Sequence, residues 1–153
     1  MYIDYMEGPA GTLKIIANED SIIGIEFLKS HKKEDPRVNK IIEIAKIELE
    51  EYFKGIRKEF TVPIEVTSGT EFQRKVWNAL RNIPYGEVAT YKDIATSIGN
   101  SKASRAVGNA NNKNPLSIII PCHRIIGANG ALVGYEGGLP IKKYLLDLER
   151  DSK

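Results

Sequence analysis

Cys122 is the only cysteine among the 153 residues, and it stands in the segment Pro121-Cys122-His123-Arg124. A single thiol cannot close an intramolecular disulfide. It also cannot build a cysteine-rich zinc site, which needs several thiolate or imidazole ligands close together. Two interpretations remain, a buried apolar residue or a nucleophile. An imidazole and a guanidinium directly after the cysteine are costly neighbours for an inert core residue, so the pattern favours a nucleophile.

The charge of the chain is divided unevenly between its two halves. Residues 1–66 carry 10 Lys and Arg against 13 Asp and Glu, a net charge of −3, whereas residues 67–153 carry 12 against 7, a net charge of +5. The second half is therefore the one suited to a polyanion. A charge of +5 is equally compatible with a solvated surface, so a binding motif is needed to decide.

The composition is that of a folded protein. Hydrophobic residues make up 42% of the chain, which is enough for a core and too much for a disordered chain. No apolar run is long enough to span a bilayer, and the first residues lack the basic segment and apolar stretch of a signal peptide. We therefore expect a cytoplasmic protein without membrane contact, built as one ordinary domain or two small ones.

The first half is predicted to be a small α/β domain over residues 1–66, linker included. Two β-rich runs, 11–17 and 22–28, flank a turn and indicate an antiparallel pair. Residues 58–62 are predicted to form a further strand, and residues 63–69 have the character of a linker. None of these segments suggests chemistry.

One helix is predicted between the strands of this half. Pro36 is expected to open it, because proline suits the first helical position, and its apolar residues recur at helical spacing up to a stop at Gly55. His31 stands alone among lysines before this helix. We expect it to be solvated rather than catalytic.

Residues 67–153 are predicted to form a mostly helical domain. Thr70 and Gln73 match a capping box, and an apolar stripe follows them, which indicates a helix packed on a core. After a turn, Thr90 is expected to cap a short helix over residues 91–98.

The next segment has the dimensions of a helix-turn-helix. Gly99 and Asn100 break the short helix, and Ser101 is expected to cap a second one over residues 102–110. Small side chains stand on either side of Arg105 in this second helix, so the helix can approach a nucleic-acid groove closely and the arginine can enter the base stack. A plain surface arginine on an alanine-rich helix remains the alternative.

The residues after the cysteine predict a wing beside this motif. Two short β-rich runs, 125–126 and 131–133, flank Gly127-Ala128-Asn129-Gly130, a turn signal for a hairpin. Glycines within residues 134–138 predict a loop whose backbone N–H groups can come close to a ligand.

A last helix is predicted to begin at Pro140 and to reach Glu149. Taken by itself, Glu149 is expected to be an ordinary exposed helix residue. It becomes of interest only if this helix packs back on His123.

Several motifs of the second half together resemble those of the O6-alkylguanine-DNA alkyltransferases, also called methylated-DNA–protein-cysteine methyltransferases. The resemblance covers residues 70–149 continuously, whereas the first half agrees only in length and pattern. The motifs are FQRKVW (72–77), PYGEV (84–88), TY (90–91), RAVG (105–108), NP (114–115), PCHR followed by isoleucine (121–125) and GYEGGL (134–139).

Resemblance to this family implies an α+β fold. A small ribonuclease-H-like α/β domain with an antiparallel sheet, residues 1–66, is expected to precede a mostly helical winged helix-turn-helix-like domain, residues 67–153. The implied function is repair of O6-alkylguanine in double-stranded DNA, by irreversible and stoichiometric transfer of the alkyl group to Cys122 after the base is flipped out of the helix. The resemblance implies a monomer that binds the minor groove and needs no cofactor or metal; activity on O4-alkylthymine is left open.

The resemblance also implies roles for the residues around the thiol. Cys122 resembles the alkyl acceptor, and His123 resembles the base that removes its proton through a bound water. Glu149 resembles the carboxylate that holds this imidazole. The reaction needs such help, because a free cysteine is mostly protonated near neutral pH while the thiolate is the nucleophile. Asn114 resembles the residue that braces the turn around the active-site loop.

Further residues resemble those that handle DNA. Tyr91 matches the tyrosine whose hydroxyl assists the departing guanine and whose ring crowds the 3′ phosphate during nucleotide rotation. Arg105 matches the residue that fills the space left by the flipped base. The other residues carried over line the DNA-facing helix or the base pocket, the latter partly through main-chain groups: Ser104, Ala106 and Gly108 for the helix, and Ile125, Tyr135 and Glu136 for the pocket.

Two positions depart from some relatives: Glu136 stands where several have a small or hydroxyl side chain, and Ser117 stands where some have proline. Only the backbone of residue 136 is therefore expected to contact O6, and tolerance of bulky alkyl groups is open. A zinc site of the first domain is not expected, because its cysteines are absent. The alternatives are a binding-only winged-helix lesion sensor or regulator, and a cysteine hydrolase; adjacent Cys and His disfavour the latter.

Overall fold

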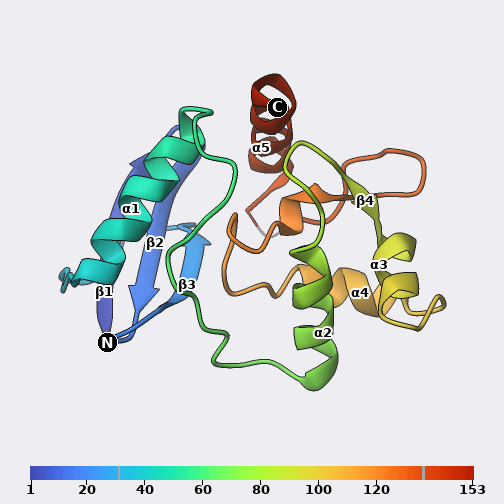
Figure 1. The fold of residues 1–153 in the computed structure, drawn as a ribbon, viewed down its shortest axis with the longest axis horizontal. Coiled ribbons are helices and arrows are strands. Elements are labelled where there is room, and N and C mark those ends of the chain that lie inside the picture. The colour runs from blue at the N-terminus through green and yellow to red at the C-terminus, as the bar shows by residue number, and fades with distance from the viewer. Residues whose placement is uncertain (31, 136) are drawn as a thin grey trace.

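The computed structural model describes residues 1–30, 32–135 and 137–153, so the expectations for His31 and Glu136 lie outside the described residues. Figure 1 shows the architecture: a sheet with helix α1 forms one side, helices α2, α3 and α4 form the other, and helix α5 stands between them. Within the described residues no helix is long and apolar enough to cross a membrane.

The N-terminal side is a three-stranded antiparallel sheet in the order β1-β2-β3. Its strands are β1 (Tyr2–Gly8), β2 (Gly11–Ala17) and β3 (Ile22–Phe27). Alternate residues of β2 are completely buried, as expected of a strand with one face on a core. The two predicted strands are thus confirmed, and β1 was missed because its residues are only partly buried and its polarity hides the alternation.

Helix α1 (Lys40–Phe53) covers the buried face of the sheet. The prediction that Pro36 opens it was wrong. Asn39 caps the helix by accepting a hydrogen bond from Ile42 N at 3.0 Å, while Arg37 pairs as a β-bridge with Ile3. The start of α1 is therefore set by the Asn39 side-chain cap and not by Pro36.

The predicted strand over residues 58–62 was also wrong. These residues are irregular. The carboxylate of Glu48 on α1 accepts hydrogen bonds from Thr61 N and Val62 N at 2.9 and 3.0 Å, and from Thr61 Oγ1 at 2.5 Å. The backbone donors that a strand would offer to a neighbour are thus satisfied by a side chain.

The C-terminal side contains α2 (Glu71–Leu80), α3 (Tyr91–Ser97), α4 (Ser104–Asn111) and α5 (Leu139–Ser152). Both predicted caps are confirmed, since Thr70 and Thr90 form complete capping boxes with Gln73 and Asp93. The cap predicted at Ser101 was wrong: α4 starts at Ser104, two residues later than predicted, and its N-cap residue Ala103 provides no side-chain hydrogen bond.

The predicted β-hairpin wing did not form. Strand β5 (Ile125–Ile126) pairs in parallel with β4 (Ala89–Thr90), the segment just before α3, and residues 131–133 are not a strand. The turn itself is present, because Gly127 N donates to Ala131 O at 2.9 Å. Residues 125–126 therefore pair with β4 and not with residues 131–133, as the hairpin would require.

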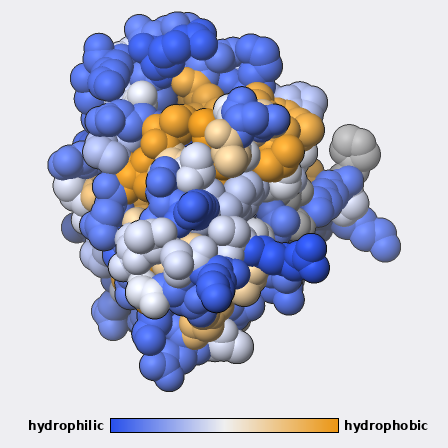
Figure 2. Space-filling model, turned by 90° about the vertical axis from the view of Figure 1, so that its right-hand side faces the viewer, coloured by the Kyte–Doolittle hydropathy of each residue, from blue (hydrophilic) through white to orange (hydrophobic). Residues whose placement is uncertain are grey.

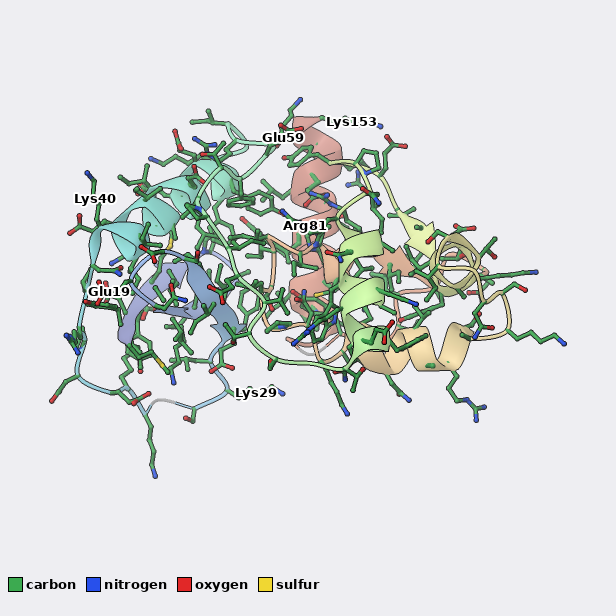
Figure 3. All side chains as sticks on the ribbon, turned by 60° about the horizontal axis from the view of Figure 1, so that its bottom comes forward. Glu19, Lys29, Lys40, Glu59, Arg81 and Lys153 are labelled. Atoms are coloured by element: carbon green, nitrogen blue, oxygen red, sulfur yellow. The ribbon has the colours of Figure 1, made fainter. Side chains whose placement is uncertain are left out.

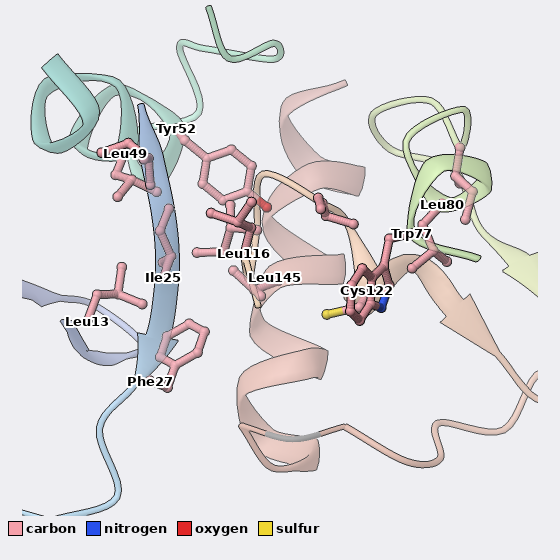
Figure 4. Close-up of a cluster of buried hydrophobic side chains, with 14 of the residues drawn as sticks. Leu13, Ile25, Phe27, Leu49, Tyr52, Trp77, Leu80, Leu116, Cys122 and Leu145 are labelled. Atoms are coloured by element: carbon pink, nitrogen blue, oxygen red, sulfur yellow. The ribbon is translucent and has the colours of Figure 1, made fainter. Parts of the chain in front are cut away.

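The two sides share one hydrophobic core (Figure 4). Segment 115–117 lies along β3, where Ile25 N donates to Pro115 O at 2.9 Å and Ser117 N donates to Ile25 O at 3.0 Å. Leu116 is completely buried in this junction. Figure 3 shows side chains filling the space between the sheet side and α5, with charged ends such as those of Lys40 and Lys153 at the periphery. The segment leading to the cysteine is thus fixed by both sides.

Candidate active site

The chain around Cys122 is held by two asparagine side chains. Asn114 Nδ2 donates to Ile120 O at 2.7 Å, and its Oδ1 accepts from Leu116 N at 2.9 Å. Inside this braced turn Ile118 adopts a φ of 73°, a left-handed conformation that a β-branched residue rarely takes. Asn111 Nδ2 donates to Cys122 O at 3.3 Å, at the start of the 3₁₀ turn Cys122–Arg124.

The next residue, His123, is paired with a carboxylate of α5. Its Nε2 lies 2.6 Å from Glu149 Oε2, and both side chains are essentially inaccessible to solvent. Burial lowers the pKa of His123 against the opposing effect of the Glu149 carboxylate, so the neutral imidazole is favoured. Its Nδ1 is buried and has no hydrogen-bond partner among the described residues. The ring therefore offers one nitrogen to Glu149 and leaves the other available.

Glu149 is an anion held by several donors. Arg124 contributes Nε at 2.8 Å and a second nitrogen at 3.1 Å, and the backbone N–H of Gly86 donates at 3.2 Å. A further donor is the Tyr52 hydroxyl, at 2.5 Å. Burial alone would raise the pKa of Glu149, but the hydrogen bonds from His123 and Arg124 and the positive charge of Arg124 outweigh it and bring the pKa well below its usual range.

Lys142 is a second buried cation near the thiol. It is completely inaccessible, and its Nζ donates to Val133 O at 2.8 Å. Burial lowers its pKa to about 8, while the negative charge that Cys122 can carry acts in the opposite direction. Lys142 therefore couples the loop after the cysteine to the electrostatics of the thiol.

Tyr91 fastens the same loop from the other side. Its hydroxyl donates to Val133 O at 3.1 Å, and a Cβ at Gly134 would lie 3.2 Å from the Tyr91 hydroxyl oxygen. Its ring packs against α4, where a Cβ at Gly108 would lie 3.5 Å from it. Gly134 and Gly108 thus make room for the tyrosine between the loop and α4.

Arg105 lies on the exposed face of α4, away from the buried cluster. Arg105 and Ala106 are solvent-exposed, and Ser104 and Gly108 are partly exposed. Figure 2 shows the face on the α3 and α4 side of the molecule as largely hydrophilic, with a hydrophobic band across it. The structure therefore separates a surface helix from a reacting centre, with Tyr91 between them.

The expected pocket residues Ile125 and Tyr135 differ in burial. Ile125 is completely buried, and its backbone pairs with Ala89, while Tyr135 is partly buried. The pKa of Tyr135 is raised first by burial and then by the charge of the neighbouring Cys122. Among the described residues, no three His, Cys, Asp or Glu side chains gather as a metal site.

Comparison with known proteins identifies the family. The family described as "6-O-methylguanine DNA methyltransferase, DNA binding domain" matches residues 71–151, and that described as "6-O-methylguanine DNA methyltransferase, ribonuclease-like domain" matches residues 1–66. The chain belongs to the 6-O-methylguanine DNA methyltransferases. The predicted order, a ribonuclease-like domain with an antiparallel sheet followed by a helical DNA-binding domain, is thereby confirmed.

Individual relatives match this methyltransferase along almost its whole length. The methylated-DNA–protein-cysteine methyltransferase of Methanosarcina acetivorans is 50% identical over 154 residues, which cover 97% of this chain and 98% of the relative. The constitutive enzyme of that name from Bacillus subtilis is 45% identical, with 99% and 96% covered. The crystal structure of Mycobacterium tuberculosis OGT in complex with DNA has a TM-score of 0.91 at 39% identity, covering 99% of this chain and 94% of that one.

Sequence reasoning missed three buried residues of this methyltransferase site: Tyr52, Arg124 and Lys142. Arg124 was noticed only as a neighbour of the cysteine, and its bond to Glu149 needs the fold of α5 to be known. Lys142 stands two residues after Pro140 in a predicted helix, where a lysine is normally exposed. Tyr52 had no local signal at all, because its partner is 97 residues away.

Proposed function

We propose that the protein repairs O6-alkylguanine in double-stranded DNA by transferring the alkyl group directly to Cys122. The observation that carries this proposal is the buried His123–Glu149 pair, 2.6 Å apart, directly after the single cysteine. In the reaction the Cys122 sulfur attacks the alkyl carbon and forms a C–S bond. The bond from that carbon to O6 breaks, its electron pair stays on the guanine, and the guanine is then protonated. The thioether is stable to water, so each protein reacts once.

The thiol proton must leave before or during this attack, since the thiolate is the nucleophile. We assign its removal to His123, through one water molecule at Nδ1. Glu149 fixes the tautomer that leaves Nδ1 free and stabilises the imidazolium that forms. The lowered pKa of His123 supports this assignment, because it keeps the imidazole neutral before reaction. Asn114 is proposed to brace the loop that presents the sulfur.

Recognition of DNA is assigned to α4 and to the loop beside it. The proposed minor-groove face carries Ser104, Ala106 and Gly108, and the exposed Arg105 is proposed to fill the space of the flipped nucleotide. Tyr91 is placed between this face and the loop after Val133, a position that suits a hydroxyl assisting the departing guanine. The base pocket is proposed to involve Ile125, Tyr135 and the backbone of Glu136.

We also propose that residues 1–66 and 67–153 are the two domains and that the protein acts as a cytoplasmic monomer. The boundary is supported by the family matches, which end at residue 66 and resume at residue 71. A binding-only lesion sensor is disfavoured, because such a protein has no use for a thiol beside a buried base and carboxylate.

Intact mass tests the function directly. After mixing with duplex DNA containing O6-methylguanine, we expect one methyl group per protein, located on Cys122, with no further turnover when DNA is in excess. Cys122→Ala should bind the same DNA but gain no mass. Product in excess of protein would contradict the single-turnover mechanism, and binding of DNA without any mass gain by the native protein would favour the sensor.

A further inference from the structure

We propose that Tyr52, a residue of the N-terminal half, is a positioning residue for the catalytic pair of the C-terminal half. Its hydroxyl shares one carboxylate oxygen of Glu149 with His123 and thereby controls how strongly that carboxylate attracts the imidazole proton. This inference rests on the proposed function in one respect only, namely that His123 must be neutral to accept the thiol proton.

The contact is direct and is built into the core. Tyr52 Oη lies 2.5 Å from Glu149 Oε2, the same oxygen that lies 2.6 Å from His123 Nε2. Tyr52 is completely buried. Figure 4 shows its ring reaching from α1 towards α5, with the hydroxyl oxygen directed at that helix.

Packing fixes the position of this hydroxyl. The Tyr52 ring lies 5.6 Å from the rings of Phe53 and Phe60 and 6.2 Å from that of Tyr85. These distances are within the range of favourable aromatic contacts. A ring held on three sides has few alternative rotamers, so its oxygen stays at the carboxylate through the reaction.

The Tyr52 hydroxyl is a permanent donor. Burial raises its pKa well above the ordinary value, and the negative charge of Glu149 raises it further. The proton therefore remains on the tyrosine throughout the working range of pH. A carboxylate oxygen that accepts a strong hydrogen bond from this donor has less negative charge to offer to the imidazole proton.

Several other charged or titratable groups influence the protonation of His123. Glu149 favours its protonated form, whereas Arg124 and Lys142 oppose it by their charge, and the Cys122 sulfur is its partner in the reaction. Tyr85 faces Tyr52 and Arg124 rather than the imidazole. Removal of the Tyr52 hydroxyl should therefore raise the pKa of His123, since Glu149 loses a competing donor while the other charges stay in place.

The test compares Tyr52→Phe with the native protein in single-turnover methyl transfer at pH 5 and pH 8. Phenylalanine keeps the ring and removes only the hydroxyl. Because the variant imidazole binds its proton more readily, the ratio of variant to native rate should be smaller at pH 5 than at pH 8, by up to about tenfold for each unit by which the pKa of His123 rises. A ratio that is the same at both pH values would mean a structural role only and would overturn the proposal.

A matched control is Tyr2→Phe. The Tyr2 hydroxyl also donates to a glutamate, Glu19, at 2.7 Å, but this contact is exposed and belongs to the sheet. We expect its rate ratio to be close to one at both pH values. If Tyr2→Phe changed the ratio as Tyr52→Phe does, the effect would not come from the Glu149 contact, and the proposal would fail.

A second measurement does not depend on alkyl transfer. In Cys122→Ala the thiol no longer titrates, and the chain has only two histidines, so His123 can be followed by NMR after nitrogen labelling. Adding Tyr52→Phe should move its titration to higher pH. An unmoved titration would overturn the inference, whereas a native protein that fails to accept methyl groups would instead overturn the proposed function.

A third variant covers the case in which Tyr52→Phe does not fold. Fluorotyrosine at position 52 fits the same space and is a stronger donor, because fluorine makes the phenol more acidic. It should move the His123 titration in the opposite direction, to lower pH. A shift in the same direction as Tyr52→Phe, or none, would contradict control by this hydrogen bond.

Discussion

In the part of the chain that the structure describes, each half of the molecule has one buried glutamate on a helix, and the two carboxylates have similar surroundings. Glu48 on α1 is 4% exposed and Glu149 on α5 is 1% exposed. For both, burial raises the carboxyl pKa and hydrogen bonds outweigh this effect, so that the pKa is lowered. Both accept several donors, with an arginine nearby.

The difference lies in what the donors are. Glu48 binds Thr61 and Val62 through backbone amides and a hydroxyl, none of which titrates near neutral pH. Glu149 binds an imidazole that follows a thiol in the chain. A buried carboxylate with a shifted pKa therefore does not by itself indicate an active site. The titratable partner, and what stands next to that partner, make the distinction.

Glu149→Gln is expected to have the largest effect on the rate of methyl transfer, an effect that Glu48→Gln should not share. Without the anion the His123 imidazolium loses its stabilisation, and we expect methyl transfer to slow by about a hundredfold or more. The rise of the pH–rate profile should move towards about 8.5, the reference for a free cysteine. Single-turnover rates across a pH series provide the measurement.

The combination with His123→Ala sharpens this result. If the two residues act as a unit, the double variant should be little slower than either single variant. Losses that multiply, with an unmoved pH profile, would return Glu149 to a structural role like that of Glu48.

The next largest effect on the rate of repair is expected from Arg105→Ala. Arg105 is exposed and belongs to the surroundings of neither Glu48 nor Glu149. If Arg105 replaces an extruded base, its loss affects only the step that costs a few kcal/mol of unstacking. We expect repair of duplex DNA to slow by tens of times, while reaction with free O6-benzylguanine changes less than about threefold. Equal losses on both substrates would make Arg105 a structural residue.

Glu48→Gln should have a moderate effect, on stability alone. It removes a charged acceptor from the buried amide of Val62 and the partly buried amide of Thr61, and we expect the free energy of unfolding to fall by about 2 kcal/mol. The rate of methyl transfer by the folded protein should stay within about twofold of native. Urea unfolding measures the loss of stability, and single-turnover assays on the same preparation measure the rate. A rate loss comparable to that of Glu149→Gln would end the distinction drawn between the two carboxylates.

The sequence predicted those features whose causes are local. The capping boxes at Thr70 and Thr90 lie within four residues of chain, and both are formed. The motif around Cys122 led to His123 and, through the resemblance, to Glu149. The strand predicted over 58–62 was wrong because its donors bind Glu48, a residue 13 and 14 positions away.

The hairpin wing failed for a related reason, since β5 pairs with β4 rather than with residues that follow it. The roles of Lys142 and Tyr52 were not predicted, because neither residue differs from a typical lysine or tyrosine in its own helix. Only the packing of α1 and α5 around the cysteine loop makes one a buried cation and the other a donor to Glu149. Partners brought together by the fold leave no periodic or spacing signal in the chain.

The smallest expected effect concerns the pH dependence of stability. The pKa of His123 is lowered in the folded protein, chiefly by burial, from its ordinary value of 6.5. Above that pH the imidazole is neutral in both states, and the shift has no effect. Below it the unfolded chain binds a proton that the folded protein does not. The free energy of unfolding therefore decreases as the pH is lowered, by at most about 1.4 kcal/mol per pH unit. The loss is complete once the pH passes the lowered pKa.

His123→Gln isolates this contribution. Glutamine offers Glu149 a neutral donor and does not titrate, and His31 is common to both proteins, so its contribution cancels in the comparison. Between pH 6.5 and 5 the native protein should lose stability more steeply than the variant in urea unfolding. Glu48 and Glu149 act in a separate window, below about 4.5, where their lowered pKa values begin to count. Parallel curves above pH 5 would mean that His123 is not held neutral by burial, and the electrostatic contrast between the two buried carboxylates would lose its basis.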